Sequence, residues 1–357
     1  MLREQPSPLA RYLFVAYALL VVYASLQPFS GWRDQGLPPL AFLSAPFPRS
    51  VPAFDVIANV LGYVPFGFLA VLAAHPSMRG TAALTFGIAC AFLLSFLLEM
   101  LQLYLPSRVS SNLDLLANAA GGTLGALAAA VSSRHILRDE GLHALRDRLF
   151  LPGGRTDLGL VLLGLWLLSQ LNPETLLFGA GDLRVLFQTP PAKLYPAELF
   201  LRVEAAVAGA NIVVAGLLVS CLTARGQPTR LLVVILVASA LAVRSLAFGL
   251  LFSPQNMLLW VTPGALYGVA AGTVLLLIAV ELPRTAQLAL TGLALMAATA
   301  LVNLAPGNPY MTASLALWRQ GHFLNFNGVT RVVSAAWPFA AMIYLVLLAA
   351  ERGRAKG

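Results

Sequence analysis

Charge is scarce in this sequence. Only 11% of its 357 residues are Asp, Glu, Lys or Arg, against about 25% in ordinary soluble domains. Hydrophobic residues make up 59%, and the mean hydropathy is +0.79. A soluble core could not bury so much apolar surface, whereas a bilayer accommodates it. The composition therefore excludes a soluble globular protein and predicts an integral membrane protein.

Residues that bind metals or form disulfides are also few. The chain contains four His and two Cys, Cys90 and Cys221. Each Cys lies inside an apolar run, where helix packing is the ordinary role of a cysteine. This supply argues against a zinc site or a disulfide framework. Because no Gly-rich phosphate loop or nucleophile motif is present either, we expect neither a metal nor another cofactor.

The formal net charge is +8, and its distribution identifies the kind of partner. The basic residues are scattered through short connections between apolar runs rather than gathered in one patch. Such a pattern sets membrane topology and contacts lipid headgroups. We therefore expect membrane lipids as partners, and no nucleic acid.

Apolar runs of helical length are abundant. A helix needs about 20 residues to cross the hydrocarbon core, and Pro or Gly marks most of the breaks between the runs. The first run is followed by Gln27 and Pro28 rather than by a small-residue cleavage site, so we interpret it as an uncleaved span. The fold class is thus an all-α, polytopic helical bundle with about ten transmembrane helices. The predicted spans are 11–28, 54–74, 80–104, 113–132, 157–178, 198–222, 231–252, 261–281, 286–305 and 330–350.

Ten spans place both ends of the chain on one side of the membrane. If residue 1 is cytoplasmic, the connections on that side hold roughly twice as many Lys and Arg residues as the outer connections, as the positive-inside rule requires. Arg202 and Arg244 fall within predicted spans. The predicted orientation is therefore N-in/C-in.

A charged stretch at 133–156 interrupts the apolar pattern. Leu142, Leu145 and Leu149 recur there at helical spacing, which predicts an amphipathic linker helix at the cytoplasmic surface. The stretch separates a four-helix transmembrane domain from a six-helix transmembrane domain. The predicted domains are 1–132 and 157–357.

Three predicted spans each carry one carboxylate and one amide, three or four residues apart. This spacing places each pair on one helix face. On the predicted topology, all three pairs lie at or just beneath the outer surface, beside an arginine in a short loop. Such residues normally face the bundle interior and pair with something, so they are candidate ligand-binding residues. The polar cluster consists of Asp55, Asn59, Glu99, Gln102, Arg108, Asp114 and Asn118.

The polar cluster admits several interpretations. Three carboxylates beside one arginine leave an excess of negative charge, which protonation, a bound cation or a cationic ligand group can offset. Alternatively, Arg108 clamps a phosphate or carboxylate while Glu99 or Asp114 acts as a base. A structural explanation is that Asp55 and Asp114 cap helices and that Glu99 pairs with Arg108. Capping leaves the amide of each pair unexplained.

The polar cluster and the residues around it follow a definite order along the first third of the chain. In sequence they are Asp55…Asn59…Pro65-Phe66-Gly67, Ser95…Glu99…Gln102, Arg108 and Asp114…Asn118…Gly121-Gly122…Gly125. We expect the glycines to permit close helix packing. The succession resembles the VanZ-like family over about residues 11–132.

That family is named for a protein associated with low-level resistance to the glycopeptide teicoplanin. The resemblance implies a polytopic protein of the bacterial envelope, in the inner membrane. It assigns no catalytic residue. The additional six-span half departs from a minimal VanZ-like protein, and its role can therefore differ.

The second predicted domain has candidates of its own. Glu198 and Arg202, four residues apart, predict an ion pair on a helix surface. Arg244 lies near the middle of a span, and we interpret Glu204 as its partner, because an intramembrane arginine is a functional-site hypothesis that needs a carboxylate.

The longest outer connection, 303–331, contains Trp318, His322 and Asn325. Aromatic rings and amides suit the faces and hydroxyls of sugars. The alternative interpretation is an interfacial aromatic belt joined by ordinary turns.

Three functions remain open at this point. The first is a VanZ-like envelope protein that binds a lipid-linked glycan or a glycopeptide-type ligand at the outer leaflet and influences glycopeptide susceptibility. The second is a transporter or flippase of an envelope precursor. The third is an intramembrane enzyme that acts on a lipid-linked sugar or phosphate, with Glu99 or Asp114 as base and Arg108 as clamp.

Overall fold

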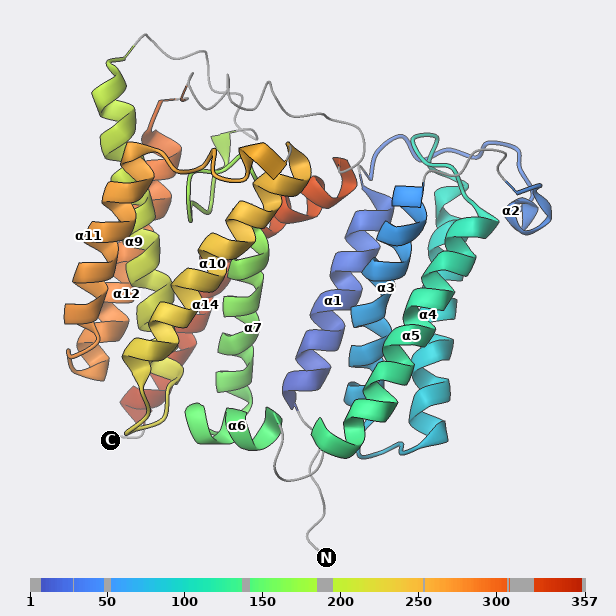
Figure 1. Cartoon of the computed structure of the whole chain (residues 1–357), viewed down its shortest axis with the longest axis horizontal. Helices are drawn as coiled ribbons and strands as arrows, with labels where there is room; N and C mark the ends of the chain where they lie inside the picture. The colour runs from blue at the N-terminus through green and yellow to red at the C-terminus, as the bar shows by residue number, and fades with distance from the viewer. Residues whose placement is uncertain are drawn as a thin grey trace, which may run out of the picture. The chain divides into compact units, whose positions relative to one another are not determined.

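A computed structural model describes residues 8–27, 29–47, 53–136, 142–184, 195–252, 254–306, 308 and 324–354. The chain divides into two compact units, Met1–Arg148 and Leu149–Gly357, and this division falls inside the stretch predicted as a linker. The regular elements of the described residues are helices (Figure 1), apart from one isolated bridge between Phe150 and Thr223.

Eight of the described helices are long and apolar enough to cross a membrane, by length and composition. The chain is therefore a multi-pass, all-α membrane protein, as the sequence predicts. The two remaining predicted spans correspond to shorter helices, α7 (Gly154–Ser169) with 16 residues and α11 (Pro263–Ala279) with 17. The prediction of one helix over 157–178 is wrong, because α7 ends at Ser169 and the chain continues without helical structure.

The first unit is built from four long helices. Helix α1 packs against α3 and α4, and α3 has its most extensive contact with α5. The eight-residue α6, within the predicted linker, follows at the boundary between the units. The helices are α1 (Pro8–Leu26), α2 (Ala41–Ser44), α3 (Ala53–Ala74), α4 (Thr81–Gln102), α5 (Asn112–Ile136) and α6 (Leu142–Leu149).

Glycines allow α3 and α5 to lie in backbone contact. A Cβ atom on Gly125 would lie 1.9 Å from the carbonyl oxygen of Val64, and one on Gly121 would lie 2.1 Å from that of Val60. No real Cβ atom fits at such a distance, so both positions require glycine. The predicted close packing is confirmed there, whereas a Cβ atom on Gly62 would meet nothing within 4 Å.

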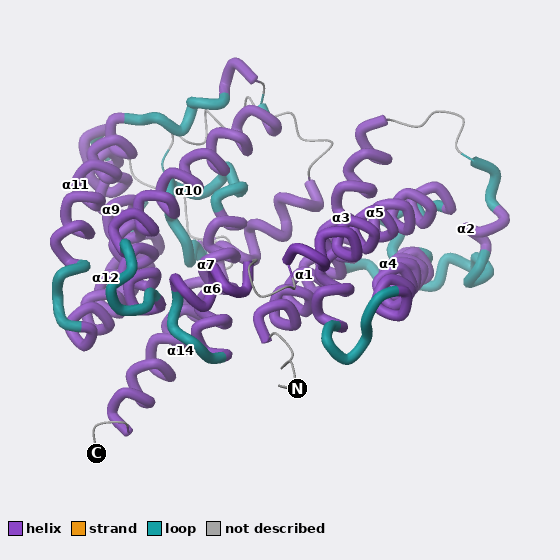
Figure 2. Tube along the Cα trace, turned by 60° about the horizontal axis from the view of Figure 1, so that its bottom comes forward, coloured by secondary structure: helices purple, strands orange, loops and turns teal. Residues whose placement is uncertain are grey.

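The second unit surrounds α9 (Ala197–Leu222). Within its apolar window 83% of the residues are buried, against 17–44% in the other seven span-length helices. Helices α7, α10, α11 and α12 all contact it, and Figure 2 shows α11 and α12 beside it. The remaining helices of this unit are α10 (Thr229–Leu251), η1 (Pro254–Asn256), α12 (Arg284–Leu304) and α14 (Leu324–Arg354).

A largely buried stretch, which we call the 170–184 segment, follows α7 and has no helical structure before Arg184. Gln170 and Asn172 within it are each 1% exposed. Its backbone takes positive φ values at Phe178 (60°) and Gly181 (82°), which interrupts any helical continuation. In a membrane protein, irregular backbone at depth must find partners for its polar groups inside the protein.

Candidate functional site

The polar cluster lies at one end of the first unit, where α1 and α4 end and α3 and α5 begin. Contacts between these helix ends locate it there. The amide of Asn59 on α3 donates to a carboxylate oxygen of Asp114 on α5, at 2.9 Å. Asp114 is also within electrostatic range of Asp55 and Glu99. The fold therefore brings the three predicted carboxylates together, with Asp55 exposed and Asp114 partly buried.

Glu99 is the most buried of the three, with 3% of its surface exposed. Its carboxylate accepts a hydrogen bond from the backbone N–H of Ser111, at 2.8 Å. The Ser111 hydroxyl accepts bonds from the N–H groups of Leu113 and Asp114 at the start of α5. Ser111 is thus the N-cap of α5, and the capping explanation of Asp114 is wrong. The carboxylate of Asp114 instead accepts the bond from Asn59.

A second polar layer lies deeper in the same bundle. The amide of Asn118 donates to the hydroxyl of Ser95 on α4, at 3.0 Å, and both side chains are buried. The Asn118 carbonyl oxygen and the Tyr63 hydroxyl are buried without a hydrogen bond of standard geometry, although Ser95 and Glu99 are polar neighbours of Tyr63. Such atoms are rare in folded proteins. They give this layer unused hydrogen-bonding capacity.

Tyr63 is absent from the residues predicted to form the polar cluster. It follows Asn59 by four positions and therefore lies on the same face of α3. This four-residue spacing could have assigned Tyr63 to the polar cluster, because the same spacing rule identifies the carboxylate–amide pairs. Its aromatic ring made it look like an ordinary apolar residue of the span.

Gln102 and Arg108 belong to a different set of contacts. Gln102 donates to the backbone carbonyl of Ser25, at 2.8 Å. Arg108 donates to the carbonyls of Ala24 and Gln27, at 2.8–3.0 Å. These oxygens lie at the end of α1, where the last helical carbonyls have no partner within the helix. Gln102 therefore fastens the end of α1 to the end of α4, and Arg108 fastens it to the loop that joins α4 and α5.

These contacts are not the ones that the sequence suggested for Arg108. The described ion pairs do not include one between Arg108 and Glu99, so the structural ion pair of the sequence interpretation is wrong. Burial lowers the pKa of the Arg108 guanidinium, yet an arginine stays protonated in proteins. Its charge is directed at backbone carbonyls.

The connection between α1 and α3 lies against the loop that joins α4 and α5. Gln35 donates to the carbonyl of Leu103 at 2.6 Å, and the N–H of Arg33 donates to that of Tyr104 at 3.0 Å. Asn112, at the start of α5, donates to the carbonyl of Ala45 at 2.7 Å. Residues 29–47 therefore form a wall beside the polar cluster.

The polar cluster is suited to organic groups that donate hydrogen bonds. Among the described residues, no group of three or more His, Cys, Asp or Glu side chains is arranged to hold a metal ion. The carboxylates, by contrast, attract ammonium groups, and they accept hydrogen bonds from hydroxyls. The arrangement can therefore bind a cationic or hydroxyl-rich molecule.

In the second unit, the predicted pair of Glu198 and Arg202 is present as an exposed ion pair of 2.6 Å. Arg244 is 2% exposed, and its terminal nitrogens donate to the carbonyls of Asn172 and Thr175 in the 170–184 segment. Glu204 lies within electrostatic range of Arg244. The sequence identified Arg244 and its carboxylate neighbour but not the backbone carbonyls that Arg244 binds.

The remaining candidates of the second domain lie where little is described. Trp318 and His322 are outside the described residues. Of Asn325, only the backbone at the start of α14 is described.

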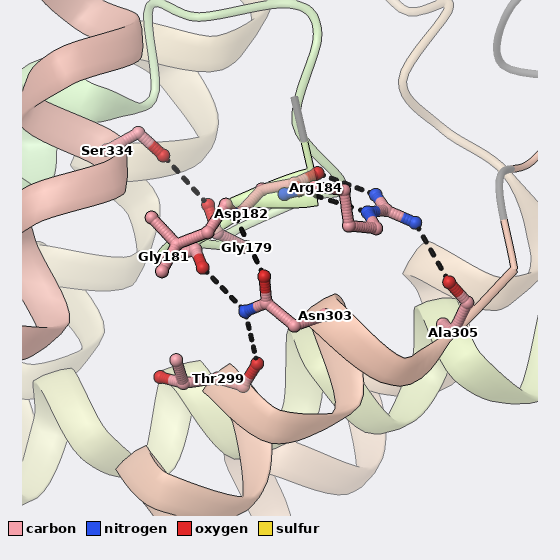
Figure 3. A network of polar contacts seen from close by, with 9 residues as sticks. Gly179, Gly181, Asp182, Arg184, Thr299, Asn303, Ala305 and Ser334 are labelled. Carbon is pink, nitrogen blue, oxygen red and sulfur yellow. Dashed lines mark hydrogen bonds and ion pairs between the residues drawn. The ribbon is translucent and has the colours of Figure 1, made fainter. Parts of the chain in front are cut away.

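The 170–184 segment is held by side chains that the sequence analysis did not single out (Figure 3). Asn303 on α12 donates to the carbonyl of Gly181 at 2.7 Å and accepts from the N–H of Leu183 at 2.9 Å. On α14, the Ser334 carbonyl accepts from the N–H of Gly181 at 2.8 Å. Arg184 pairs with Asp182 at 2.6 Å, and this hydrogen-bonded pairing raises the pKa of Arg184. Pro173 lies inside this predicted span, but a proline alone does not mark a break, because α3 and α14 continue through Pro65 and Pro338.

Comparison with known proteins bears on the first unit. Residues 11–133 match the family model described as VanZ/LLP1. The N-terminal module is therefore VanZ-like, in agreement with the resemblance in its polar residues. The matched region contains the whole polar cluster. No curated protein and no solved structure matches the chain.

Proposed function

We propose that the VanZ-like module binds the cationic or hydroxyl-rich end of an amphipathic ligand, at the outer leaflet of the bacterial inner membrane. The observation that carries the proposal is the separation of Arg108 from the carboxylates. Arg108 donates to the carbonyls at the end of α1, while Asp55, Glu99 and Asp114 lie together at the same end of the unit without a basic partner among the described ion pairs.

The electrostatics of this gathering favour a cationic group. Carboxylates near one another in a weakly polar medium are destabilised by desolvation and by mutual repulsion. Asn59 and the Ser111 N–H each supply a hydrogen bond, but neither supplies a positive charge. A ligand ammonium would offset the excess, and ligand hydroxyls would satisfy the remaining acceptors.

Lipid-linked glycans and glycopeptides combine these features. Lipid-linked glycans carry sugar hydroxyls and an apolar part that partitions into the bilayer. Glycopeptides carry sugar hydroxyls, many carry amines, and the acylated ones also carry an apolar chain. The free carbonyl oxygen of Asn118 and the Tyr63 hydroxyl provide further hydrogen-bonding positions behind the carboxylates. The VanZ-like character of the module points to the glycopeptide class, with teicoplanin susceptibility as the phenotype to examine.

The two alternatives fare differently. A lipid-linked phosphate enzyme would need Arg108 as a clamp, and the guanidinium already donates to Ala24 and Gln27. A transporter or flippase would need polar groups along its path, and buried Arg244 beside Glu204 in the second unit is the observation that supports it. We retain transport as the second candidate.

Native mass spectrometry of the full chain in nanodiscs tests the binding proposal. We expect a co-purifying glycan-bearing species with the wild type, and its loss from folded Glu99→Gln and Asp114→Asn variants. Asp147→Asn is the matched control, because it removes an exposed carboxylate of the same unit on α6, which follows the end of α5 that lies away from the polar cluster. Retention of the species in all variants, or its absence from the wild type, would contradict the proposal.

Cells provide an independent measurement. Expression of the wild type is expected to raise the inhibitory concentration of teicoplanin, and Glu99→Gln at equal protein level is expected to abolish the rise. An equal rise with both proteins would show that susceptibility does not depend on the polar cluster.

A further inference from the structure

The second unit contains a cavity of about 220 Å³. It lies between the 170–184 segment, α9, α10 and the start of α11. Ligand pockets of proteins are usually about 300–1,000 Å³, so this cavity suits a small molecule or a headgroup rather than a whole lipid. The lining residues that matter below are Thr175, Phe200, Glu204, Arg244, Phe248 and Trp260.

Arg244 contributes a hydrogen-bond donor that the protein leaves unused. Its two terminal nitrogens donate to the carbonyls of Asn172 and Thr175. Its Nε atom is buried and has no hydrogen-bond partner among the described residues, and the whole side chain is only 2% exposed. A buried donor without an acceptor destabilises a folded protein. The contacts within the protein therefore use only some of the hydrogen-bond donors of the Arg244 guanidinium.

Glu204 contributes the opposite charge to the same cavity. The hydroxyl of Thr262 is its hydrogen-bond partner, and Arg244 is its electrostatic neighbour. The described ion pairs do not include one between Glu204 and Arg244. A cation and an anion thus line one small cavity without joining each other.

Aromatic rings complete the lining. The Arg244 guanidinium lies 5.1 Å from the centroid of the Phe248 ring. Trp260 is fixed by a hydrogen bond from its indole nitrogen to the Ser245 hydroxyl, at 2.9 Å. Phe200, on α9, is 6% exposed. The rings offer a rigid apolar surface next to the two charges.

We propose that this cavity binds a zwitterion that carries an apolar substituent. Its anionic group pairs with the Arg244 guanidinium, its ammonium group pairs with Glu204, and its apolar part packs against Phe248 and Trp260. A free α-amino acid with an apolar side chain and the ethanolamine headgroup of a phospholipid share this chemistry. The site is distinct from the polar cluster, so the failure of either proposal leaves the other standing.

Calorimetric titration of the full chain in a nonionic detergent tests the proposal. The probes are L-phenylalanine, L-leucine and a short-chain phosphatidylethanolamine. N-acetyl-L-phenylalanine, which lacks the ammonium, and L-phenylalaninamide, which lacks the carboxylate, serve as matched analogues. We expect saturable binding of either the amino acids or the lipid, and the one that binds is the source of the zwitterion. Each analogue that lacks one charge is expected to bind at least tenfold more weakly.

Variants then connect binding to the cavity. Glu204→Gln keeps the shape of the side chain and is expected to weaken binding at least tenfold, whereas Glu198→Gln, on the exposed face of the same helix, is expected to leave it unchanged. Phe200→Trp narrows the cavity without altering either charge and is expected to weaken binding. It provides the test if Glu204→Gln does not fold. The proposal would be overturned if no probe bound saturably. It would also be overturned if Phe200→Trp or folded Glu204→Gln kept wild-type affinity, or if Glu198→Gln weakened binding as much as Glu204→Gln.

Discussion

At the scale of single residues, the glycines of the first unit differ in whether they leave space for an added Cβ atom. Gly125→Ala would place a Cβ atom 1.9 Å from the Val64 carbonyl oxygen and force α3 and α5 apart. We expect a loss of about 1–3 kcal/mol in the free energy of unfolding, the usual cost of overpacking. Thermal unfolding in detergent measures it.

The control for this change is Gly62→Ala. Its Cβ atom would meet nothing within 4 Å, and alanine is the better helix former, so we expect unchanged or slightly higher stability. Equal thermal midpoints for Gly125→Ala and the wild type would show that the backbone contact of the two helices is not as close as described.

Arg108→Ala tests the other residue-scale assignment. The substitution removes the donors from the carbonyls of Ala24 and Gln27, and each buried acceptor left without a partner costs about 1–3 kcal/mol. We expect a lower unfolding midpoint, together with easier proteolysis after the end of α1. Arg33→Ala, which removes an exposed arginine of the same unit, is expected to have no effect. If Arg108→Ala instead retains stability and loses the co-purifying ligand, the clamp role returns.

The sequence predicted the members of the polar cluster better than their partners. Asp55, Glu99 and Asp114 stand out because charges are rare in apolar spans, and helical spacing assigns each to a face. Nothing in the sequence indicates that Arg108 donates to the end of α1, because its acceptors are backbone carbonyls, which every residue possesses. Contacts to backbone therefore remain invisible to an argument from side-chain types.

At the scale of secondary-structure elements, hydropathy predicted the long helices and failed in one place. The predicted spans 198–222 and 231–252 agree closely with α9 and α10, because uninterrupted apolar residues form helices in lipid. The prediction for 157–178 continued through Pro173, since apolar residues on both sides kept the average high. Hydropathy counts apolar residues and does not report where a helix ends. Proline does not settle the matter either, because α3 and α14 continue through Pro65 and Pro338.

Asn303→Leu is the element-scale prediction. Asn303 bonds the N–H of Leu183 and the carbonyl of Gly181, so leucine leaves two polar backbone groups of the 170–184 segment without their partner. We expect destabilisation by about 2–6 kcal/mol, from about 1–3 kcal/mol for each group, measured by thermal or denaturant unfolding. Thr299→Val is the control on the same helix, because the Thr299 hydroxyl bonds only within α12. Similar unfolding of both variants would contradict the role assigned to Asn303.

At the scale of the whole molecule, the predicted N-in/C-in orientation is open to a direct measurement. Reporter fusions after Ala74, Ser132, Leu222 and Arg354 sample connections throughout the chain. With residue 1 in the cytoplasm, we expect these four fusions all to report the cytoplasmic side, and fusions within 29–47 and at 308 to report the outer side. An outer-side signal at 354 would mean an odd number of crossings.

The connections of the 170–184 segment have a consequence for biogenesis. Ribosomes deliver the chain from its N-terminus, so this stretch reaches the membrane before Arg244, Asn303 and Ser334 have been translated. Until α14 inserts, the backbone groups of the 170–184 segment have to bond to water or to the insertion machinery. We therefore expect nascent chains truncated before Ser334 to expose the stretch to added protease, and complete chains to protect it.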